Sequence, residues 1–546
     1  MTRIVRATLG VALAASVAAT DVARAAASDQ DPLIAHVAAG ELRGMASASD
    51  ASIRVYRGVP FAAPPVGPLR WRPPAAVASW QGAREATTFA PPCAQTERPG
   101  RAGGAVIGSE DCLYLNVWTG ATPGARRPVL VWIHGGGMRR GSASDPARDG
   151  SALAAQGLVV VSVAYRLGVL GFFSHPLLSA ESEHDSSGTY VVLDLVAALR
   201  WIADNVDAFG GDPSNVTIFG QSGGARAVQY LQATPLARGL FQRAIAHSSG
   251  SFEERTYLRD PPTGGESAEA VGERWAAALL DGRQAAATGG DRLAALRALP
   301  VEHVVGVIEG LLPHYSLPVD RWVLPDTTRS LFAAGKQTDV PILVGWNGNE
   351  AAGMADSARA PGDAAEFATR VVEEFGDSAT GFTELYPPGD DPRAAFLRGY
   401  GVETFGWNMR AWARAMRTVR SPAFLYHFER SPSTPPGTLA RHGAELAYVF
   451  GNLDSEKQGS AADRERARLM MSYWIAFATA GDPNAAVDRR PGDAAVERPR
   501  WERYTAETDQ TMVFGETVEL RRGVRATELQ FFDDFFEAQL SSDAGP

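Results

Sequence analysis

The segment "NVTIFGQSGGARAV", residues 215–228, places one hydroxyl group between glycines at a change of sequence pattern. The apolar run before the glycines predicts a buried strand, and Ala225–Leu231 predicts a helix. A Gly-x-Ser-x-Gly sequence is a weak signal alone, but between a strand and a helix it predicts a strained turn that exposes the serine oxygen. Gly220 and Gly224 allow neighbouring backbone to approach closely. Ser222 is therefore a candidate nucleophile.

Four other apolar runs predict buried strands of the same kind. They are continuous rather than alternating, as expected where helices cover both faces of a sheet. The predicted strands, including the one before Ser222, are Pro128–Ile133, Leu158–Tyr165, Asn215–Gly220, Val340–Gly345 and Ala423–Phe428. Between the second and third, residues 192–206 carry apolar side chains at helical spacing, which predicts an α/β fold with a mostly parallel sheet. Helical patterns dominate residues 251–339 and 363–418, which we interpret as insertions over the sheet edge.

Composition, charge and residue spacing argue against a nucleic-acid-binding protein and against a zinc site. The chain has 546 residues, of which 45% are hydrophobic and 21% charged, as in globular proteins with a large core. Its formal net charge of -10 argues against nonspecific nucleic-acid binding, which usually requires a basic patch. The histidines and cysteines do not have zinc-site spacing, so we expect no metal site. The serine chemistry considered below needs no organic cofactor, so we expect none.

The N-terminus has the three-part plan of a secretory signal peptide: two arginines, a short apolar stretch and small residues. We expect residues 1–25 to be cleaved and the mature chain, residues 26–546, to be exported to the periplasm or beyond. No later apolar run is long enough to span a membrane. In an exported protein, the pair Cys93 and Cys112 predicts a disulfide rather than two free thiols.

A serine hydroxyl is a poor nucleophile near neutral pH, so the hypothesis also requires a base, an acid and donors for an oxyanion. The sequence "HGGG", His134–Gly137, directly follows a predicted strand. Glycines there let backbone N–H groups point into a cavity, although a plain flexible turn is the alternative. We predict an oxyanion hole formed by the N–H groups of Gly136, Gly137 and Gly223.

Several long segments, in the same order, resemble the type B carboxylesterases, a family that also contains the cholinesterases. The segments are "YRGVPFAAPPVGPLRWRPP" (Tyr56–Pro74), "SEDCLYLNVW" (Ser109–Trp118), "VWIHGGG" (131–137), "YRLGVLGF" (Tyr165–Phe172), "FGGDPSNVTIFGQSGG" (Phe209–Gly224) and "HGAELAYVFGN" (His442–Asn452). The resemblance covers nearly all of the mature chain. It implies a single catalytic domain with the α/β-hydrolase fold, whose mostly parallel twisted sheet is flanked by helices, with helical insertions over the active site.

The resemblance also implies an acid and a base. The family carries its acid in a Gly-x-Asn-x-Asp-Glu-Gly loop after a strand, and "GWNGNEA" places Glu350 at that position. Asn349 and Ala351 depart from the family pattern, and an exposed loop carboxylate is the alternative reading of Glu350. The segment "HGAELAYVFGN" matches the catalytic-histidine loop, so His442 is expected to accept the proton of Ser222 while Glu350 orients its ring.

The other histidines have structural interpretations. We expect His134 to shape the end of the oxyanion strand, His247 to lie in a supporting loop, and His427 to be a satisfied core or surface residue. The remaining five lack a partner motif. The resemblance also places Cys93 and Cys112 where the family closes a disulfide loop near the active-site rim.

Departures from the family concern the substrate. Gly223 stands where many members have alanine, and Met138, Arg139 and Arg140 stand where an aromatic and small residues are frequent. One hypothesis is that Arg139 or Arg140 binds a carboxylate-bearing ester; the alternative, which we favour, is that both point to solvent. The other candidate substrate-binding residues, with core packing as an equal alternative, are Met138, Phe172, Tyr315, Trp346 and Trp407.

These features predict a serine carboxylesterase that converts small-molecule carboxylic esters to acid and alcohol through an acyl-enzyme. One alternative is a narrower esterase or lipase for a bulky or anionic ester, such as a polyester, a lactone or a mycotoxin-like compound. Another is a non-catalytic binding relative, which is disfavoured because Ser222, Glu350 and His442 are all present. The sequence leaves the oligomeric state open.

Overall fold

The computed structural model describes residues 31–97, 104–262, 264–280, 289–311, 314–354, 359–430, 435, 438–453, 459–486 and 497–543. The expected signal peptide, residues 1–25, lies outside these ranges. A search of the described helices finds none that is both long and apolar enough to cross a membrane.

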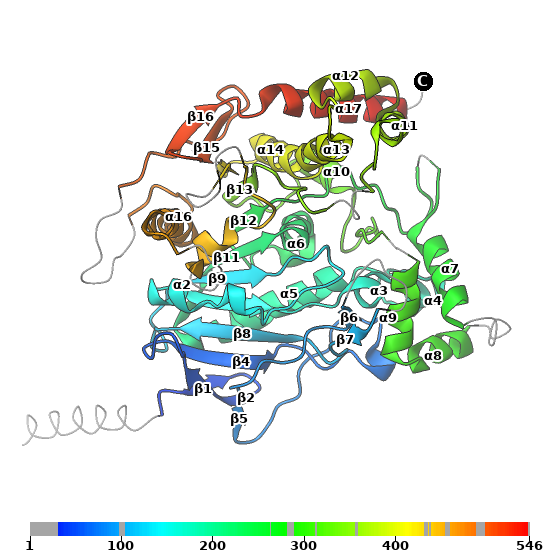
Figure 1. Ribbon diagram of the computed structural model, residues 1–546. Coiled ribbons are helices and arrows are strands. Elements are labelled where there is room, and N and C mark those ends of the chain that lie inside the picture. Colours follow the sequence, from blue (N-terminus) through cyan, green and yellow to red (C-terminus); the bar gives the residue numbers. More distant parts are fainter. Residues whose placement is uncertain are drawn as a thin grey trace, which may run out of the picture.

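A sheet of eleven strands forms the centre of the described part of the molecule (Figure 1). In order across the sheet, the strands are β16 (Val518–Arg522), β15 (Gln510–Phe514), β14 (Ala423–Phe428), β13 (Ile342–Asn347), β12 (Arg243–His247), β11 (Gly211–Gln221), β9 (Arg127–Ile133), β10 (Val159–Val163), β8 (Tyr114–Thr119), β4 (Arg54–Pro60) and β3 (Met45–Ala46). All neighbours from β15 to β10 pair in parallel, whereas β16, β8, β4 and β3 pair antiparallel at the two flanks. The predicted α/β-hydrolase sheet is confirmed.

The five predicted strands are all present, as β9, β10, β11, β13 and β14. The bounds of β14 are those predicted. By contrast, β11 begins at Gly211 rather than Asn215, because Gly211 pairs with Arg127 of β9 across an irregularity in the register. Small sheets lie beside the large one, formed by β1 (Ile34–Val37), β2 (Gly40–Arg43) and β5 (Ala83–Glu85), and by β6 (Gln95–Thr96) and β7 (Val106–Ile107).

Helices cover both faces of the sheet (Figure 1). Along β9, Val129 and Val131 face one core with α5 and α6, and Leu130 and Trp132 face another with α15 and α16. Burial on both faces explains the continuous apolar runs of the strands. The helices are α2 (Ser151–Ala155), α3 (Gly168–Phe172), α4 (Pro176–Glu181), α5 (Tyr190–Asn205), α6 (Gly223–Ala233), α7 (Ala268–Leu280), α8 (Gly290–Ala298), α9 (Val301–Gly310), α10 (Thr328–Ala333), α11 (Ala364–Phe375), α12 (Ala379–Leu385), α13 (Pro392–Gly401), α14 (Asn408–Ala415), α15 (Leu446–Phe450), α16 (Ala461–Ala480) and α17 (Ala526–Asp543).

The two expected insertions are helical. Helices α7 to α10 lie within residues 251–339, and α11 to α14 within residues 363–418. Helix α9 packs against α3, and a π-helical segment, Val402–Trp407, packs against β13 and α17. These contacts bring the insertions to the segment that follows β10 and to strand β13.

Candidate active site

Ser222 occupies a strained turn between β11 and α6. Its φ of 56° and ψ of -126° lie outside the regions that residues with a side chain usually adopt. The flanking glycines explain how the turn fits. A Cβ atom on Gly220 would lie 2.2 Å from the Gly224 carbonyl oxygen, and one on Gly224 would lie 2.1 Å from the Ile133 carbonyl oxygen. The motif glycines are therefore required by close backbone approach.

The loop after β9 lies against the start of α6. A Cβ atom on Gly223 would come within 3.0 Å of the Gly137 nitrogen and 2.8 Å of the Met138 nitrogen. Gly136 and Gly137 have positive φ angles of 105° and 63°. Among the described residues, the N–H groups of Gly136 and Gly137 donate to no backbone acceptor. The N–H of Gly223, the first residue of α6, has no acceptor within that helix.

Glu350 and His442, 92 positions apart in the sequence, form a hydrogen bond of 2.6 Å between Oε2 and Nδ1. The Glu350 side chain is 1% exposed and the His442 side chain 16%. Burial of His442 opposes its charged form, but the charge and hydrogen bond of Glu350 outweigh burial, so the pKa of His442 is raised above its ordinary value of 6.5. Glu350 is thus buried and paired, rather than the exposed loop carboxylate considered as its alternative.

Gln221, the residue before Ser222, contacts the other nitrogen of the His442 ring. Its Nε2 lies 2.9 Å from His442 Nε2. Because Nδ1 faces the Glu350 carboxylate and carries the proton, Nε2 accepts and the Gln221 amide donates. Among the described residues, Ser222 Oγ makes no hydrogen bond. The lone pair that a base would use is therefore occupied by a neutral neighbour of the serine.

Comparison with known proteins gives a family for this arrangement. The Carboxylesterase family model matches residues 31–532. The chain belongs to the carboxylesterase family. It is 36% identical to the fumonisin B1 esterase of Sphingopyxis macrogoltabida over 85% of both chains, and 30% identical to the para-nitrobenzyl esterase of Bacillus subtilis over 90% of this chain and 96% of that one. Among solved structures, a carboxylesterase from Geobacillus stearothermophilus matches with a TM-score of 0.74 and 32% identity, covering 92% of this chain and 100% of that one.

The contact between Gln221 and His442 predicts a pH effect in this carboxylic ester hydrolase. In the variant Gln221→Glu, a carboxylate accepts from a protonated Nε2 and stabilises the imidazolium, so the pKa of His442 rises further. Because His442, the predicted base, would work only when neutral, the acidic limb of the kcat/KM profile is expected to move to higher pH. The variant Gln242→Glu, which adds the same charge at the edge of β12, serves as control. A limb that stays in place for Gln221→Glu would contradict the assigned contact.

Sequence reasoning missed two contacts of the esterase's histidine loop. Gln221 is the second residue of the Gly-x-Ser-x-Gly motif, but the sequence does not indicate that it contacts His442. Phe405, in the π-helical segment, packs against His442 in a tilted arrangement, with 4.7 Å between ring centroids. No local pattern marks Phe405, because the contact depends on how an insertion folds over the sheet.

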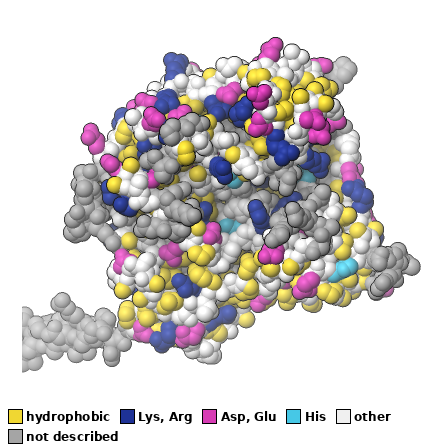
Figure 2. All heavy atoms as spheres, viewed as in Figure 1, with side chains coloured by type: hydrophobic (Ala, Val, Ile, Leu, Met, Phe, Trp, Pro, Cys, Tyr) yellow, Lys and Arg dark blue, Asp and Glu magenta, His cyan; other side chains and the backbone are white. Residues whose placement is uncertain are grey.

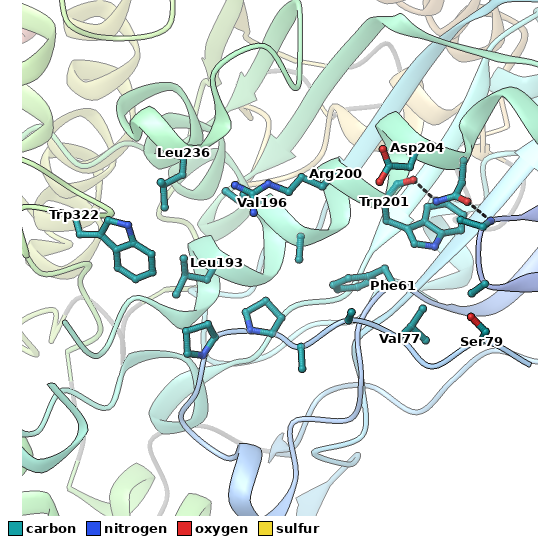
Figure 3. A pocket seen from close by; sticks show the side chains of 18 residues that line it. Phe61, Val77, Ser79, Leu193, Val196, Arg200, Trp201, Asp204, Leu236 and Trp322 are labelled. Atoms are coloured by element: carbon teal, nitrogen blue, oxygen red, sulfur yellow. Dashed lines mark hydrogen bonds between the residues drawn. The ribbon is translucent and has the colours of Figure 1, made fainter. Parts of the chain in front are cut away.

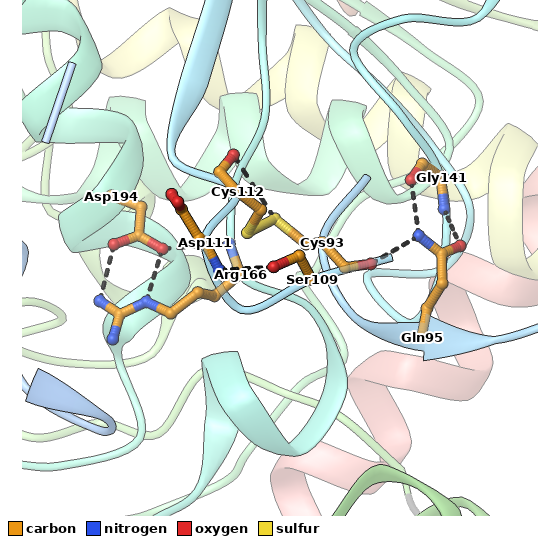
Figure 4. Close-up of a disulfide and its surroundings, with 8 residues drawn as sticks. All are labelled: Cys93, Gln95, Ser109, Asp111, Cys112, Gly141, Arg166 and Asp194. Carbon is orange, nitrogen blue, oxygen red and sulfur yellow. Dashed lines mark hydrogen bonds and ion pairs between the residues drawn. A yellow bond between two sulfur atoms is a disulfide. The ribbon is translucent and has the colours of Figure 1, made fainter. Parts of the chain in front are cut away.

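The Cys93–Cys112 disulfide is present, with an S–S distance of 2.06 Å, so the predicted pairing is confirmed (Figure 4). The loop that it closes is tied to the loop after β9 through Gln95. The Gln95 amide donates to the Gly141 carbonyl at 2.9 Å and accepts from the Gly141 N–H at 2.8 Å. Its Nε2 also donates to the Cys93 carbonyl at 2.9 Å. The disulfide loop therefore supports the far end of the glycine-rich loop.

The two arginines of the esterase's glycine-rich loop have different environments. Arg139 donates to Glu309 of α9 at 2.5 Å through Nη2, and the Glu309 side chain is only 4% exposed. Arg139 therefore does not point freely to solvent, which corrects half of the favoured interpretation, and its charge is already paired. Arg140 is exposed, in agreement with the other half. Met138, which belongs to the same loop, is fully buried.

The four aromatic candidates occupy three different places. Phe172 and Tyr315 pack together with ring centroids 5.6 Å apart, and the Tyr315 hydroxyl donates to Glu309 at 2.8 Å. Trp346 lines a cavity of about 290 Å³ beside Glu350. Trp407 donates to Asp533 of α17 at 2.9 Å. The structure thus brings Phe172 and Tyr315 to the Arg139 side, and holds Trp407 in the packing against the C-terminal helix.

A larger cavity, of about 520 Å³, lies elsewhere in the esterase, between α5 and residues 73–77 (Figure 3). Phe61, Leu193 and Trp322 are among its lining residues, and none of the candidate catalytic residues is. The larger cavity therefore does not coincide with the candidate site around Ser222.

Basic side chains lie at the rim of a hollow near the centre of the face shown in Figure 2.

Proposed function

We propose that the protein is a serine esterase in which Ser222, His442 and Glu350 act as nucleophile, base and orienting acid. One observation carries the proposal: the His442 ring of a buried Glu350–His442 pair contacts Gln221, the residue before Ser222 at its strained turn. Ser222 and His442 are joined indirectly through Gln221, and a direct hydrogen bond between nucleophile and base often forms only when substrate binds.

The reaction proceeds by two acyl transfers. The Ser222 oxygen attacks the ester carbonyl while its proton passes to His442 Nε2, after the Gln221 amide has released that lone pair. The resulting imidazolium then protonates the departing alcohol. In the second half, His442 takes a proton from water, hydroxide attacks the acyl-enzyme, and the acid leaves as the proton returns to Ser222.

Charge develops on the carbonyl oxygen during both attacks. The N–H groups of Gly136, Gly137 and Gly223 point from two adjoining backbone segments and are proposed to bind this oxyanion. The N-terminal end of α6, at Gly223, adds a favourable dipole. No step requires a group other than the side chains, the backbone and water.

The substrate is proposed to be a bulky ester. The names of two relatives, a fumonisin B1 esterase and a para-nitrobenzyl esterase, support large acyl or alcohol groups. The earlier hypothesis of a carboxylate-bearing ester now depends on Arg140, because Arg139 is paired with Glu309. Of the two arginines in the glycine-rich loop, Arg140 is the exposed one that could pair with a terminal carboxylate of the ester.

The experiment combines turnover with a covalent trap. The purified protein is expected to hydrolyse p-nitrophenyl esters, with rates that depend on acyl length and on a terminal carboxylate. An aryl phosphonate should inactivate it with one equivalent bound, and peptide mass mapping should place the phosphonate on Ser222. Turnover without labelling, or labelling of another residue, would exclude this mechanism; a folded protein inactive on every ester would favour the binding-relative alternative.

We also propose that the mature protein is exported. A disulfide forms readily in oxidising compartments, and the N-terminal pattern is that of a signal peptide. N-terminal sequencing of protein from the periplasm and the medium would locate the cleavage site, which is expected after Ala25.

A further inference from the structure

His247 and Glu445 form a second histidine–carboxylate pair beneath the proposed site. Both side chains are 0% exposed, and His247 Nδ1 lies 2.9 Å from Glu445 Oε1. On the opposite edge of the ring, the Trp474 indole N–H donates to His247 Nε2 at 3.0 Å. Because Nε2 accepts that bond, the ring proton lies on Nδ1 and is donated to Glu445. The tautomer of His247 is therefore fixed by two partners.

Both oxygens of Glu445 have a donor. Burial would raise its pKa, but the hydrogen bonds donated by His247 and by Asn347 stabilise the carboxylate, and the pKa of Glu445 is lowered. His247 Nδ1 donates a hydrogen bond to Oε1, and the Asn347 side-chain amide donates one to Oε2. A fully buried carboxylate is tolerated only when it is paired in this way.

The pair joins two of the loops that carry the proposed triad. The backbone carbonyl of His247, the last residue of β12, accepts the N–H of Ser222 at 2.8 Å. Glu445 lies three residues after His442, on the same short loop before α15. The imidazole of His247 thus links the strand that holds the nucleophile to the loop that holds the base.

Asn347, the last residue of β13, connects the loop that carries Glu350 to Glu445. Its side-chain amide also donates to the Arg441 carbonyl at 2.7 Å, and its backbone N–H donates to Glu350 Oε1. The residues that support nucleophile, base and acid are therefore connected through the single carboxylate of Glu445.

The surroundings of His247 leave little room for another ring position. Its imidazole lies 4.8 Å from the Phe219 ring, 5.0 Å from the Tyr426 ring and 5.4 Å from the Trp474 ring, measured between centroids. Densely packed aromatic side chains resist displacement, so the hydrogen bonds of His247 act on a ring that is held in place.

We propose that His247 is a positioning residue of the esterase: its bond to Glu445 sets the distance between the Ser222 turn and the His442 loop. This inference rests on the function proposed above. It assigns His247 no contact with substrate, so its effect should appear in the chemical step rather than in substrate binding. A misplacement of about 1 Å between reacting groups can cost on the order of 100-fold in rate.

Two substitutions of His247 separate the hydrogen bond from the packing. His247→Asn keeps an N–H donor where Nδ1 was and can still bind Glu445, whereas His247→Leu fills similar space without a donor. We expect kcat to fall about 10- to 100-fold in His247→Leu, with KM within about twofold of wild type. His247→Asn should restore most of kcat.

A third variant keeps the inference testable if His247→Leu does not fold. Glu445→Gln has nearly the same shape but lacks the charge that, after that of Glu350, helps to raise the pKa of His442. We expect it to lower kcat and to move the acidic limb of the pH profile to lower pH.

Phosphonate labelling of the wild type separates a failure of the proposed esterase function from a failure of the positioning role of His247. If wild type is not labelled on Ser222, the proposed function fails. If it is labelled, but folded His247→Leu turns over at the wild-type kcat, or His247→Asn and His247→Leu lose kcat equally, the positioning role is overturned. A wild-type kcat and pH profile in Glu445→Gln would overturn it equally.

Discussion

Replacing Ser222 with alanine is expected to lower kcat for p-nitrophenyl esters by on the order of 10⁴-fold or more, because the acyl-enzyme can no longer form. The turn itself should persist, since its shape depends on the close packing of Gly220 and Gly224. Activity is measured by release of p-nitrophenol, and folding by circular dichroism and melting temperature. Residual activity should reflect only the oxyanion donors and substrate binding.

The chain offers a matched control for this substitution. Ser248 also has a positive φ, 55°, and is fully buried, and its hydroxyl has no hydrogen-bond partner among the described residues. Ser248→Ala therefore makes the same chemical change in a similar backbone conformation without touching the proposed nucleophile. Near-normal activity of Ser222→Ala, or an equal loss in both variants, would show that Ser222 is not the nucleophile.

Replacing Glu350 with glutamine is expected to lower kcat by roughly 10³- to 10⁴-fold, the scale seen when the orienting carboxylate of a triad becomes an amide. Glutamine can present its amide to His442 Nδ1, which favours the tautomer with the proton on the wrong nitrogen. It also removes the negative charge that stabilises the imidazolium formed during both acyl transfers.

The same substitution has a defined effect on the pH profile. In the wild type, Glu350 raises the pKa of His442 above its ordinary value of 6.5, so activity is lost as the pH falls through that raised pKa. Without the charge of Glu350, burial of the ring is the larger influence and lowers the pKa. The acidic limb of kcat/KM should therefore move to lower pH, which is opposite to the shift expected for Gln221→Glu.

A carboxylate elsewhere provides the comparison for Glu350→Gln. The side chain of Glu519, on the edge strand β16, is 50% exposed and pairs with Arg521, so Glu519→Gln should leave kcat and the pH profile unchanged. If Glu350→Gln keeps full activity, the acid must be another group. Glu445 would be the first to test, because it is buried three residues from His442.

Local sequence was sufficient to predict the sheet and the turn. The buried runs of β9, β10, β11, β13 and β14 are recognisable because both faces of each strand are covered, and the disulfide followed from two cysteines and a family pattern. Gly220 is required by a clash with Gly224, inside the strand-turn-helix unit itself, and Gly224 by a clash with Ile133 at the end of the neighbouring strand β9. The roles of Ser222, His442 and Glu350 stay predictions until the variants are measured.

The sequence by itself determined the α/β fold, the strained turn and which residues could be nucleophile, base and acid, because those features depend on short-range sterics and on recognisable motifs. The tertiary structure alone decided which distant residues these side chains pair with through hydrogen bonds and ion pairs. Arg139 meets Glu309 across 170 positions of sequence, and His247 meets Glu445 across 198. Gln221, rather than Ser222, occupies His442 Nε2 from 221 positions away. Such pairs are set by how loops and helical insertions pack over the sheet edge, and packing between distant segments leaves no periodic signal in either segment.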